Sequence, residues 1–166
     1  VFTGVAELAG FVLFAIRWIQ ELPFGEALYT SLFHSVSAFC NAGFSLYRGS
    51  MTEYSGDILL NLTMIILIVV GGIGFPVLHE LHVWMKRRHS ERVRLSVHFK
   101  TVLITSAVLI VGGAVMFAFL EWDTMAADHS SGEVALISLF QSVTCRTAGF
   151  NTVDVSSLNE VTLAMM

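Results

Sequence analysis

The segment 101–120, TVLITSAVLIVGGAVMFAFL, contains no charged residue and is long enough to cross a bilayer as a helix, which takes about 20 mostly apolar residues. A second apolar stretch covers roughly 57–78, and a shorter one, 5–18, has the character of the end of a further span. The sequence is 55% hydrophobic and 13% charged, whereas soluble domains have roughly 25% charged residues. These features predict an all-α membrane protein and exclude an ordinary soluble domain.

Both ends of the sequence lie close to or inside apolar segments. Val1 is not an initiator methionine and no charged region of a signal peptide precedes the first apolar run, while the sequence stops at Met166 within VTLAMM. We therefore interpret the sequence as a piece of a longer membrane protein.

Most of the positive charge lies in one segment, 79–100 (HELHVWMKRRHSERVRLSVHFK). Its acidic residues are Glu80 and Glu91, and its basic residues are Lys86, Arg87, Arg88, Arg92, Arg94 and Lys100. Short loops with an excess of Lys and Arg stay on the cytoplasmic side of a membrane. We therefore expect 79–100 to be a cytoplasmic linker and the polar loops beyond the neighbouring spans to face outward.

One short phrase occurs twice in the sequence. Residues 31–46 contain SLFHSV followed by AGFSL, and residues 138–152 contain SLFQSV followed by AGFNT, with one residue more between SV and AGF in the first copy. Each copy follows an apolar span and a polar connection, and each precedes another apolar segment. The two copies indicate a repeated unit of span, short helix, glycine-containing loop and span.

Each copy begins with a helix that is too short to cross the membrane. Pro23 suits the first turn of a helix over 24–39, and Ser130 with Glu133 forms a capping-box pattern before a helix over 131–144. Helices of this length are typical of re-entrant segments that end inside the membrane. The carbonyl groups at such an end are unpaired and carry partial negative charge, so the expected guest is a cation.

This pattern divides the chain into two repeated units and a linker. The first unit, 1–78, comprises the end of a span, the short helix 24–39, the loop 41–44 and a span at 57–78. The linker is 79–100. The second unit, 101–166, comprises a span at 101–120, the short helix 131–144, the loop 147–150 and the start of another span.

The two glycine-containing loops have the composition of a selectivity filter. Adjacent carbonyl groups that replace the water shell of an alkali cation must point the same way, which requires dihedral angles that most side chains forbid. Gly43 and Gly149 supply that freedom. A single AGF phrase would also fit tight packing of a helix against a loop, but two copies favour the filter. The predicted cation-binding groups are the backbone carbonyls of Asn41, Ala42, Gly43, Phe44, Thr147, Ala148, Gly149 and Phe150.

The phrases SAFCNAGFS and TCRTAGFNT resemble those of the Trk/Ktr/HKT superfamily of potassium transporters, specifically the bacterial Trk-type membrane subunit, over nearly the whole chain. The resemblance implies a single potassium-channel-like pore built from four units, of which this chain matches the second and the third. It also implies potassium uptake across the plasma membrane, the inner membrane in bacteria. The transported ion would be K⁺, with no covalently bound cofactor.

The resemblance further implies partners. They are a second copy of the full-length subunit in a homodimer, the lipid bilayer, and a cytoplasmic nucleotide-binding regulatory subunit that is RCK-like; no nucleic-acid partner is expected. The basic segment 79–100 faces the side where the regulatory subunit would dock. Membrane topology alone explains the charge of this segment equally well.

Arg146 lies one residue before the loop 147–150. An arginine within the membrane is costly and usually functional. Two interpretations stay open: the guanidinium supports the filter from behind by binding carbonyl or carboxylate groups, or the side chain extends to the outer surface.

Other classes of function find less support in the sequence. The GGIGFP phrase at 71–76 lacks the Lys-Ser/Thr of a phosphate loop, and the HELH phrase at 79–82 spaces its histidines i, i+3 rather than the i, i+4 of a zinc helix. A membrane-embedded hydrolase needs a nucleophile and base, or metal ligands, at membrane depth, and a structural anchor needs no repeated loop. The sequence therefore predicts an ion pathway without enzymatic activity or a transition-metal site; the alternative is an anchor or hydrolase without ion conduction.

Overall fold

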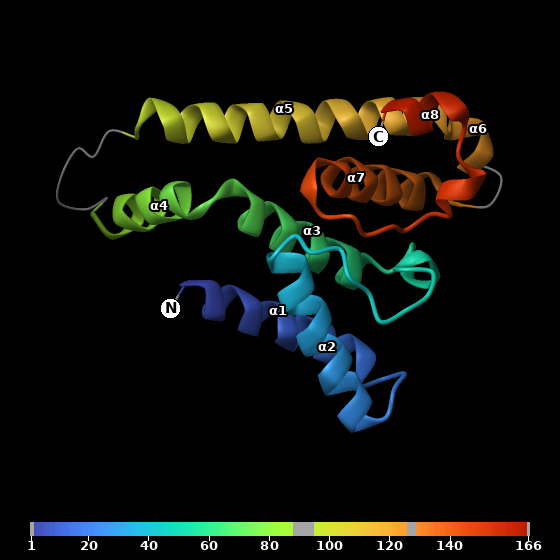
Figure 1. Ribbon diagram of the computed structural model, residues 1–166, viewed down its shortest axis with the longest axis horizontal. Coiled ribbons are helices and arrows are strands. Elements are labelled where there is room, and N and C mark those ends of the chain that lie inside the picture. Colours follow the sequence, from blue (N-terminus) through green and yellow to red (C-terminus); the bar gives the residue numbers. More distant parts are fainter. Residues whose placement is uncertain (1, 88–94, 126–128, 166) are drawn as a thin grey trace.

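The computed structural model describes residues 2–87, 95–125 and 129–165, which form helices and short 3-10 turns and contain no strand. The all-α prediction is therefore confirmed for the described residues. In Figure 1, α5 runs along α7, and α1 and α2 pack against α3 away from α5. The elements are α1 (Phe2–Trp18), α2 (Phe24–Phe39), η1 (Thr52–Tyr54), α3 (Ile58–Ile73), α4 (Phe75–Arg87), α5 (Val97–Leu120), α6 (Trp122–Met125), α7 (Ser131–Thr147), η2 (Val155–Ser157) and α8 (Glu160–Met165).

The main core lies where α3 meets α1, α2 and α7. Leu60, Met64 and Leu67 recur every three or four residues along α3 and are buried, because this spacing places them on one face of a helix. Trp18 of α1 and Phe140 of α7 are fully buried in the same cluster. The cluster joins the two repeats through α3.

The start of α3 is fixed to the end of α1 by charged groups. The Asp57 carboxylate caps α3 by accepting a hydrogen bond of 3.0 Å from the Leu60 N–H. The Arg17 guanidinium donates to Asp57 and also to Glu21, in the latter case at 2.5 Å. Asp57 thus joins the last turn of α1 to the first turn of α3.

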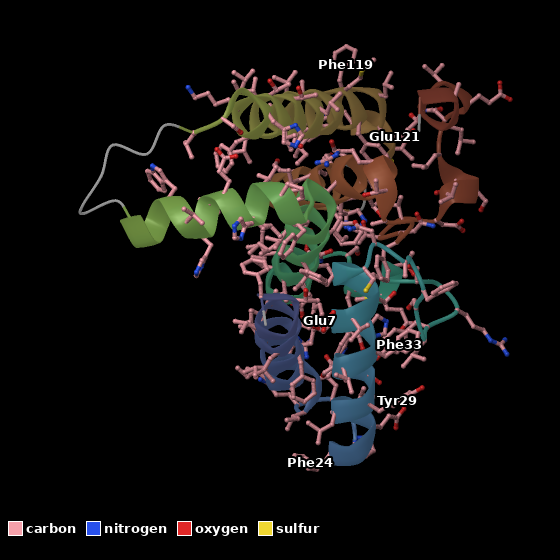
Figure 2. All side chains as sticks on the ribbon, turned by 60° about the vertical axis from the view of Figure 1, so that its left-hand side comes forward. Glu7, Phe24, Tyr29, Phe33, Phe119 and Glu121 are labelled. Atoms are coloured by element: carbon pink, nitrogen blue, oxygen red, sulfur yellow. The ribbon has the colours of Figure 1, made fainter. Side chains whose placement is uncertain are left out.

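Helix α5 alone among the described helices is long and apolar enough to cross a membrane by itself. It begins at Val97 rather than at 101, because the Ser96 hydroxyl caps it by accepting a hydrogen bond of 3.1 Å from the Phe99 N–H. Along most of its length α5 exposes apolar side chains. Phe119, 82% exposed, projects away from α7 in Figure 2. This surface suits contact with lipid.

The span predicted over 57–78 is broken in the structure. α3 ends at Ile73 and α4 starts at Phe75, and the two helices are bent by 98°. Gly74 sits at the break with φ of 92°, which only glycine adopts readily. Pro76 lies in the first turn of α4, where its missing N–H costs nothing. The break is therefore at the glycine, not at the proline.

The segment 79–100 is partly helical. α4 continues to Arg87, and the Glu80 carboxylate accepts hydrogen bonds from Ser96 at the start of α5, from its N–H at 2.5 Å and from its hydroxyl at 2.6 Å. Arg88, Arg92 and Arg94 lie outside the described residues. Glu80 in the first half of α4 is thus hydrogen bonded to Ser96, the residue that caps α5.

Candidate functional site

The two repeated loops lie against each other. The side chains of Asn41 and Thr147, which are 106 residues apart in the chain, are hydrogen bonded at 3.1 Å. A Cβ atom at Gly43 would overlap the Ala148 carbonyl oxygen and would lie 3.2 Å from the Gly149 Cα, so only glycine fits at position 43. The structure therefore brings the two predicted loops together as neighbours in contact.

The chain just beyond the loops is also paired. The Met51 N–H donates a hydrogen bond of 2.8 Å to the Asn151 carbonyl, and the Asn151 N–H donates one of 3.0 Å to the Ser50 hydroxyl. These bonds hold the segments that follow Phe44 and Phe150 side by side.

The polar residues of the repeated phrase make the same hydrogen bonds in both copies. The Ser37 hydroxyl donates to the Phe44 carbonyl at 2.8 Å, and the Thr144 hydroxyl donates to the Phe150 carbonyl at 2.8 Å. Each short helix therefore holds the loop that follows it by the carbonyl next to the loop glycine. Each of these two carbonyls has one lone pair left for another ligand.

A second pair of bonds ties α2 to α1 and α7 to α5. The Ser35 hydroxyl donates to the Glu7 carbonyl of α1 at 2.6 Å, and the Ser142 hydroxyl donates to the Ile110 carbonyl of α5 at 2.7 Å. In both cases a glycine three residues further along the longer helix makes room for the serine: added Cβ atoms at Gly10 and Gly113 would press on Ser35 and Ser142 respectively. The sequence repeat thus has a counterpart in three dimensions.

The loop glycines use the freedom that the sequence assigns to them. Gly43 has φ of 71° and Gly149 has φ of 79°. This left-handed region is costly for residues with a Cβ atom. Substitution at either position would change the direction of the neighbouring carbonyl groups.

The loops differ in how their helices end. After α2, Asn41 has φ of 53°; its N–H donates to Ala38 at 3.1 Å and the next N–H, of Ala42, donates to Ser37 at 2.9 Å, which is a Schellman cap with asparagine in the left-handed position. α7 instead runs through Thr147, three residues beyond the predicted 144. Gly149 is then the left-handed residue that follows its C-cap.

The extra residue of the first copy explains this difference. Asn41 ends α2 and leaves Gly43 in a separate loop, whereas the second copy lacks that residue and Gly149 both ends the helix and shapes the loop. Thr147 and Ala148 therefore belong to the end of a helix and not to an extended segment. Exposure follows the same asymmetry, because Phe44 is 70% exposed and Phe150 is fully buried.

His34 and Gln141 occupy equivalent buried positions behind the loops, and the sequence interpretation missed both. The His34 Nδ1–H donates to the Thr30 carbonyl at 2.9 Å, which leaves Nε2 to accept from the Ser45 hydroxyl at 3.1 Å. The Gln141 amide is buried without a hydrogen-bond partner in the described part of the chain. The sequence signal that could have identified them is their shared position in the repeated phrases SLFHSV and SLFQSV.

Arg146 is half-buried near this glutamine. The two residues line a cavity of about 200 Å³ between α5 and α7, together with Ser142, Cys145 and Thr162. Among the described residues no carboxylate forms a salt bridge with Arg146. The Arg146 guanidinium therefore projects from the last turn of α7 and forms no salt bridge within the described residues.

A larger polar cavity of about 770 Å³ lies next to the chain that follows the loops, and Arg48, His129 and Asp154 line it. The Ser156 hydroxyl and N–H hydrogen-bond to the Asp154 carboxylate and lower its pKa below the ordinary value. Glu121, fully buried at the end of α5 (Figure 2), accepts from the Thr162 hydroxyl at 2.5 Å. Within residues 2–87, 95–125 and 129–165, no three His, Cys, Asp or Glu side chains come together as a metal site.

Comparison with known proteins assigns the chain to a family. The TrkH family model, described as cation transport protein, matches residues 1–166. The chain is 38% identical to Ktr system potassium uptake protein B of Vibrio alginolyticus over 99% of its own length and 36% of that protein. It is 34% identical to Ktr system potassium uptake protein B of Bacillus subtilis (strain 168), over 95% of this chain and 35% of that protein.

The potassium/sodium uptake protein NtpJ of Enterococcus hirae is 30% identical, over 99% of this chain and 36% of that protein. The chain thus spans about a third of the length of the curated relatives it matches. These relatives are named for the uptake of potassium, or of potassium and sodium. Because the family model matches the chain from end to end, this membrane protein belongs to the TrkH family of cation transport proteins.

Proposed function

We propose that the chain forms part of a pore for potassium uptake across the plasma membrane. The observation that carries this proposal is the pair of neighbouring glycine loops, each at the end of a short helix and each held by the same hydroxyl-to-carbonyl bond. The similarity to proteins named for potassium uptake supports K⁺ as the transported ion.

The mechanism follows from the chemistry of backbone carbonyls. K⁺ loses water on entry, and carbonyl oxygens from 41–44 and 147–150 replace it. The C-terminal ends of α2 and α7 add partial negative charge close to the loops. A membrane potential that is negative inside draws the ion inward, with about 2.3 kcal/mol per unit charge per 100 mV. No covalent step and no bound cofactor is required.

The arrangement in the membrane extends the same proposal. Residues 1–78 and 101–166 are the second and third of four pore-loop repeats around one axis, with the loops toward the outer face and 79–100 in the cytoplasm. Contact between the two loops suits neighbouring quarters of a ring. The full-length subunit forms a homodimer and binds a cytoplasmic nucleotide-binding regulatory subunit. The names of its relatives, which refer to a Ktr system, are in line with such a complex.

Arg146 supports the second loop in this proposal. Its half-buried side chain and its cavity beside Gln141 favour a role behind the loop over extension to the outer surface. A guanidinium offers five donors in a fixed plane, enough to bind several carbonyl groups at once.

Ion flux in liposomes tests the function. The full-length protein is reconstituted, and uptake of K⁺ and of Na⁺ is followed separately against empty liposomes, with a K⁺ ionophore added at the end to show that the vesicles are sealed. We expect uptake of K⁺ that exceeds that of Na⁺. Sealed vesicles with inserted protein and no cation flux would favour the structural anchor.

A further inference from the structure

The Asn41 side chain lies between both loops and the last turn of α3. With its oxygen facing the Gly72 N–H at 3.2 Å, the amide nitrogen donates to the Ile68 carbonyl at 3.3 Å and to the Thr147 hydroxyl at 3.1 Å. The opposite orientation of the amide keeps the bond to Thr147 but leaves only the Phe39 carbonyl, at 3.4 Å, for the nitrogen. The hydrogen-bond network assigns the first orientation.

The two α3 groups that contact Asn41 are the donor and the acceptor of one backbone hydrogen-bond position in the helix. In an α-helix the N–H of residue 72 bonds the carbonyl of residue 68, and the Asn41 amide presents an acceptor to the first and a donor to the second. A side chain that inserts into this ladder is a known cause of kinks. The 98° bend between α3 and α4 begins two residues later, at Gly74.

Glycines allow α3 to come this close. A Cβ atom at Gly71 would overlap the Phe39 carbonyl at the end of α2, and one at Gly72 would contact Asn41 and Thr147. The backbone of Asn41 is itself left-handed, with φ of 53°, which aims its side chain from the Schellman cap of α2. The close approach of α3 to α2 and the cap geometry of Asn41 together place its amide next to the Gly72 N–H and the Ile68 carbonyl.

The bend is mechanically connected to the second loop along another route. α4 is bonded to the start of α5 through Glu80 and Ser96, and α5 packs along α7, which ends at Thr147. Thr147 returns to Asn41 through its hydroxyl. The Asn41 amide is thus connected to α4 by two routes, one through α3 and one through α5 and α7.

We propose that the Asn41 side chain is a positioning group that couples the two loops to the bend of α3. Its amide holds the loops in register only while α3 is bent, so ion discrimination and the angle at Gly74 depend on the same hydrogen bonds. This inference rests on the proposed function, because ion discrimination is its output. It assigns a role to the side chain, in addition to the carbonyl of the same residue.

Two substitutions separate the side chain from the backbone. Asn41→Gly keeps the left-handed conformation without strain and removes the amide, whereas Asn41→Ala removes the amide and adds backbone strain. Asn41→Asp keeps the shape and the acceptor for Gly72 but loses both donations and places a carboxylate beside the Ile68 carbonyl. The aspartate variant serves if the glycine variant does not fold.

Two measurements in the full-length protein test the proposal. A distance between two spin labels reports the angle between α3 and α4, and ion flux reports the discrimination between K⁺ and Na⁺. The labels are attached at Leu8→Cys on α1 and His82→Cys on α4, both exposed positions, and Cys40 and Cys145 are replaced by serine. Pulsed electron paramagnetic resonance measures the distance between the two labels. Permeability of K⁺ relative to Na⁺ is measured in liposomes from the same preparations. A purely structural cap would not move the distance.

We expect Asn41→Gly and Asn41→Asp each to shift or broaden the Leu8–His82 distance distribution and to lower the K⁺/Na⁺ ratio about fivefold, the factor for one hydrogen bond. Thr147→Val should lower the ratio as well, and the double variant Asn41→Gly/Thr147→Val should lose less than the sum. If Asn41→Gly equals the parent in both measurements and only Asn41→Ala differs, the amide has no such role. Failure of the proposed function is seen separately, as an unchanged ratio in Gly43→Ser.

Discussion

Ser37 and Thr144 donate hydrogen bonds of the same length, 2.8 Å, to the carbonyls of Phe44 and Phe150. Ser37 lies two residues before the end of α2 and Thr144 three residues before the end of α7, and each hydroxyl binds the carbonyl of the residue that follows the loop glycine. The bond fixes where the loop turns back against its helix. Two loops that differ in cap and in exposure are thus held at the same point.

Removal of these hydroxyls should loosen the loops. We expect Ser37→Ala and Thr144→Val each to lower the free energy of unfolding by about 1 kcal/mol, the net value of one hydrogen bond, and to reduce K⁺ over Na⁺ discrimination. Thermal unfolding and liposome flux of the full-length protein measure the two effects. Thr144→Ser keeps the hydroxyl and is the matched control; an equal loss in that variant would exclude the hydrogen bond as the cause.

Arg146→Gln should reduce potassium uptake while the protein stays inserted and folded, because the guanidinium that supports the second loop is lost. Arg146→Lys keeps the charge but not the planar set of donors, so we expect only partial recovery of uptake. Uptake is measured per amount of protein in the membrane. Normal uptake by Arg146→Gln at normal expression would favour a side chain that merely extends to the outer surface.

The close contact between α5 and α7 gives a prediction about stability. A Cβ atom at Gly113 would overlap the Ser142 hydroxyl, whereas one at Gly112 meets nothing within 4 Å. We expect Gly113→Ala to lower the melting temperature and Gly112→Ala to leave it equal or higher, since alanine favours helix. Gly113→Ala combined with Ser142→Ala should cost less than the sum of the two single changes. Equal effects of the two glycine variants would count against the packing seen between these helices.

Stability on the acidic side should depend on the cap of α7. The N–H and hydroxyl of Ser130 hydrogen-bond with Glu133 and lower the pKa of its carboxyl below the ordinary value of 4.5. Since the folded pKa is the lower one, this stabilisation is present above pH 4.5 and is lost as the pH falls through the folded pKa. The Ser130→Ala variant should therefore have a lower melting temperature than the parent at neutral pH. The difference in melting temperature should be smaller well below pH 4.5. A constant difference across this range would show that the carboxylate does not contribute.

Local signals predicted much of the helical structure. Pro23 and the Ser130–Glu133 capping box mark the starts of α2 and α7, and α2 has the predicted bounds of 24 and 39. These features depend on residues close together in sequence, so a single sequence contains them. The same holds for the left-handed glycines in both loops.

Other features depend on residues that meet only in the folded chain. The apolar run over 57–78 is continuous, so its pattern does not reveal that α3 breaks at Gly74. The extension of α7 to Thr147 follows from the residue missing in the second copy, which leaves no earlier cap. Tertiary packing also brings Asn41 into contact with α3. It buries His34 in α2 and Gln141 in α7, although both helices were predicted from their apolar positions.

If the loops 41–44 and 147–150 line the ion pathway, Gly43→Ser in the full-length protein should change ion discrimination. Gly43 has φ of 71° and its missing Cβ faces the Ala148 carbonyl, so a side chain there displaces both loops. Gly25→Ser, at a position with nothing within 4 Å of the added Cβ, is the matched control. The measurement is the permeability of K⁺ relative to Na⁺ in liposomes. We predict that the ratio falls in Gly43→Ser and stays at the parental value in Gly25→Ser. An unchanged ratio in folded, inserted Gly43→Ser would show that these loops do not line the ion pathway.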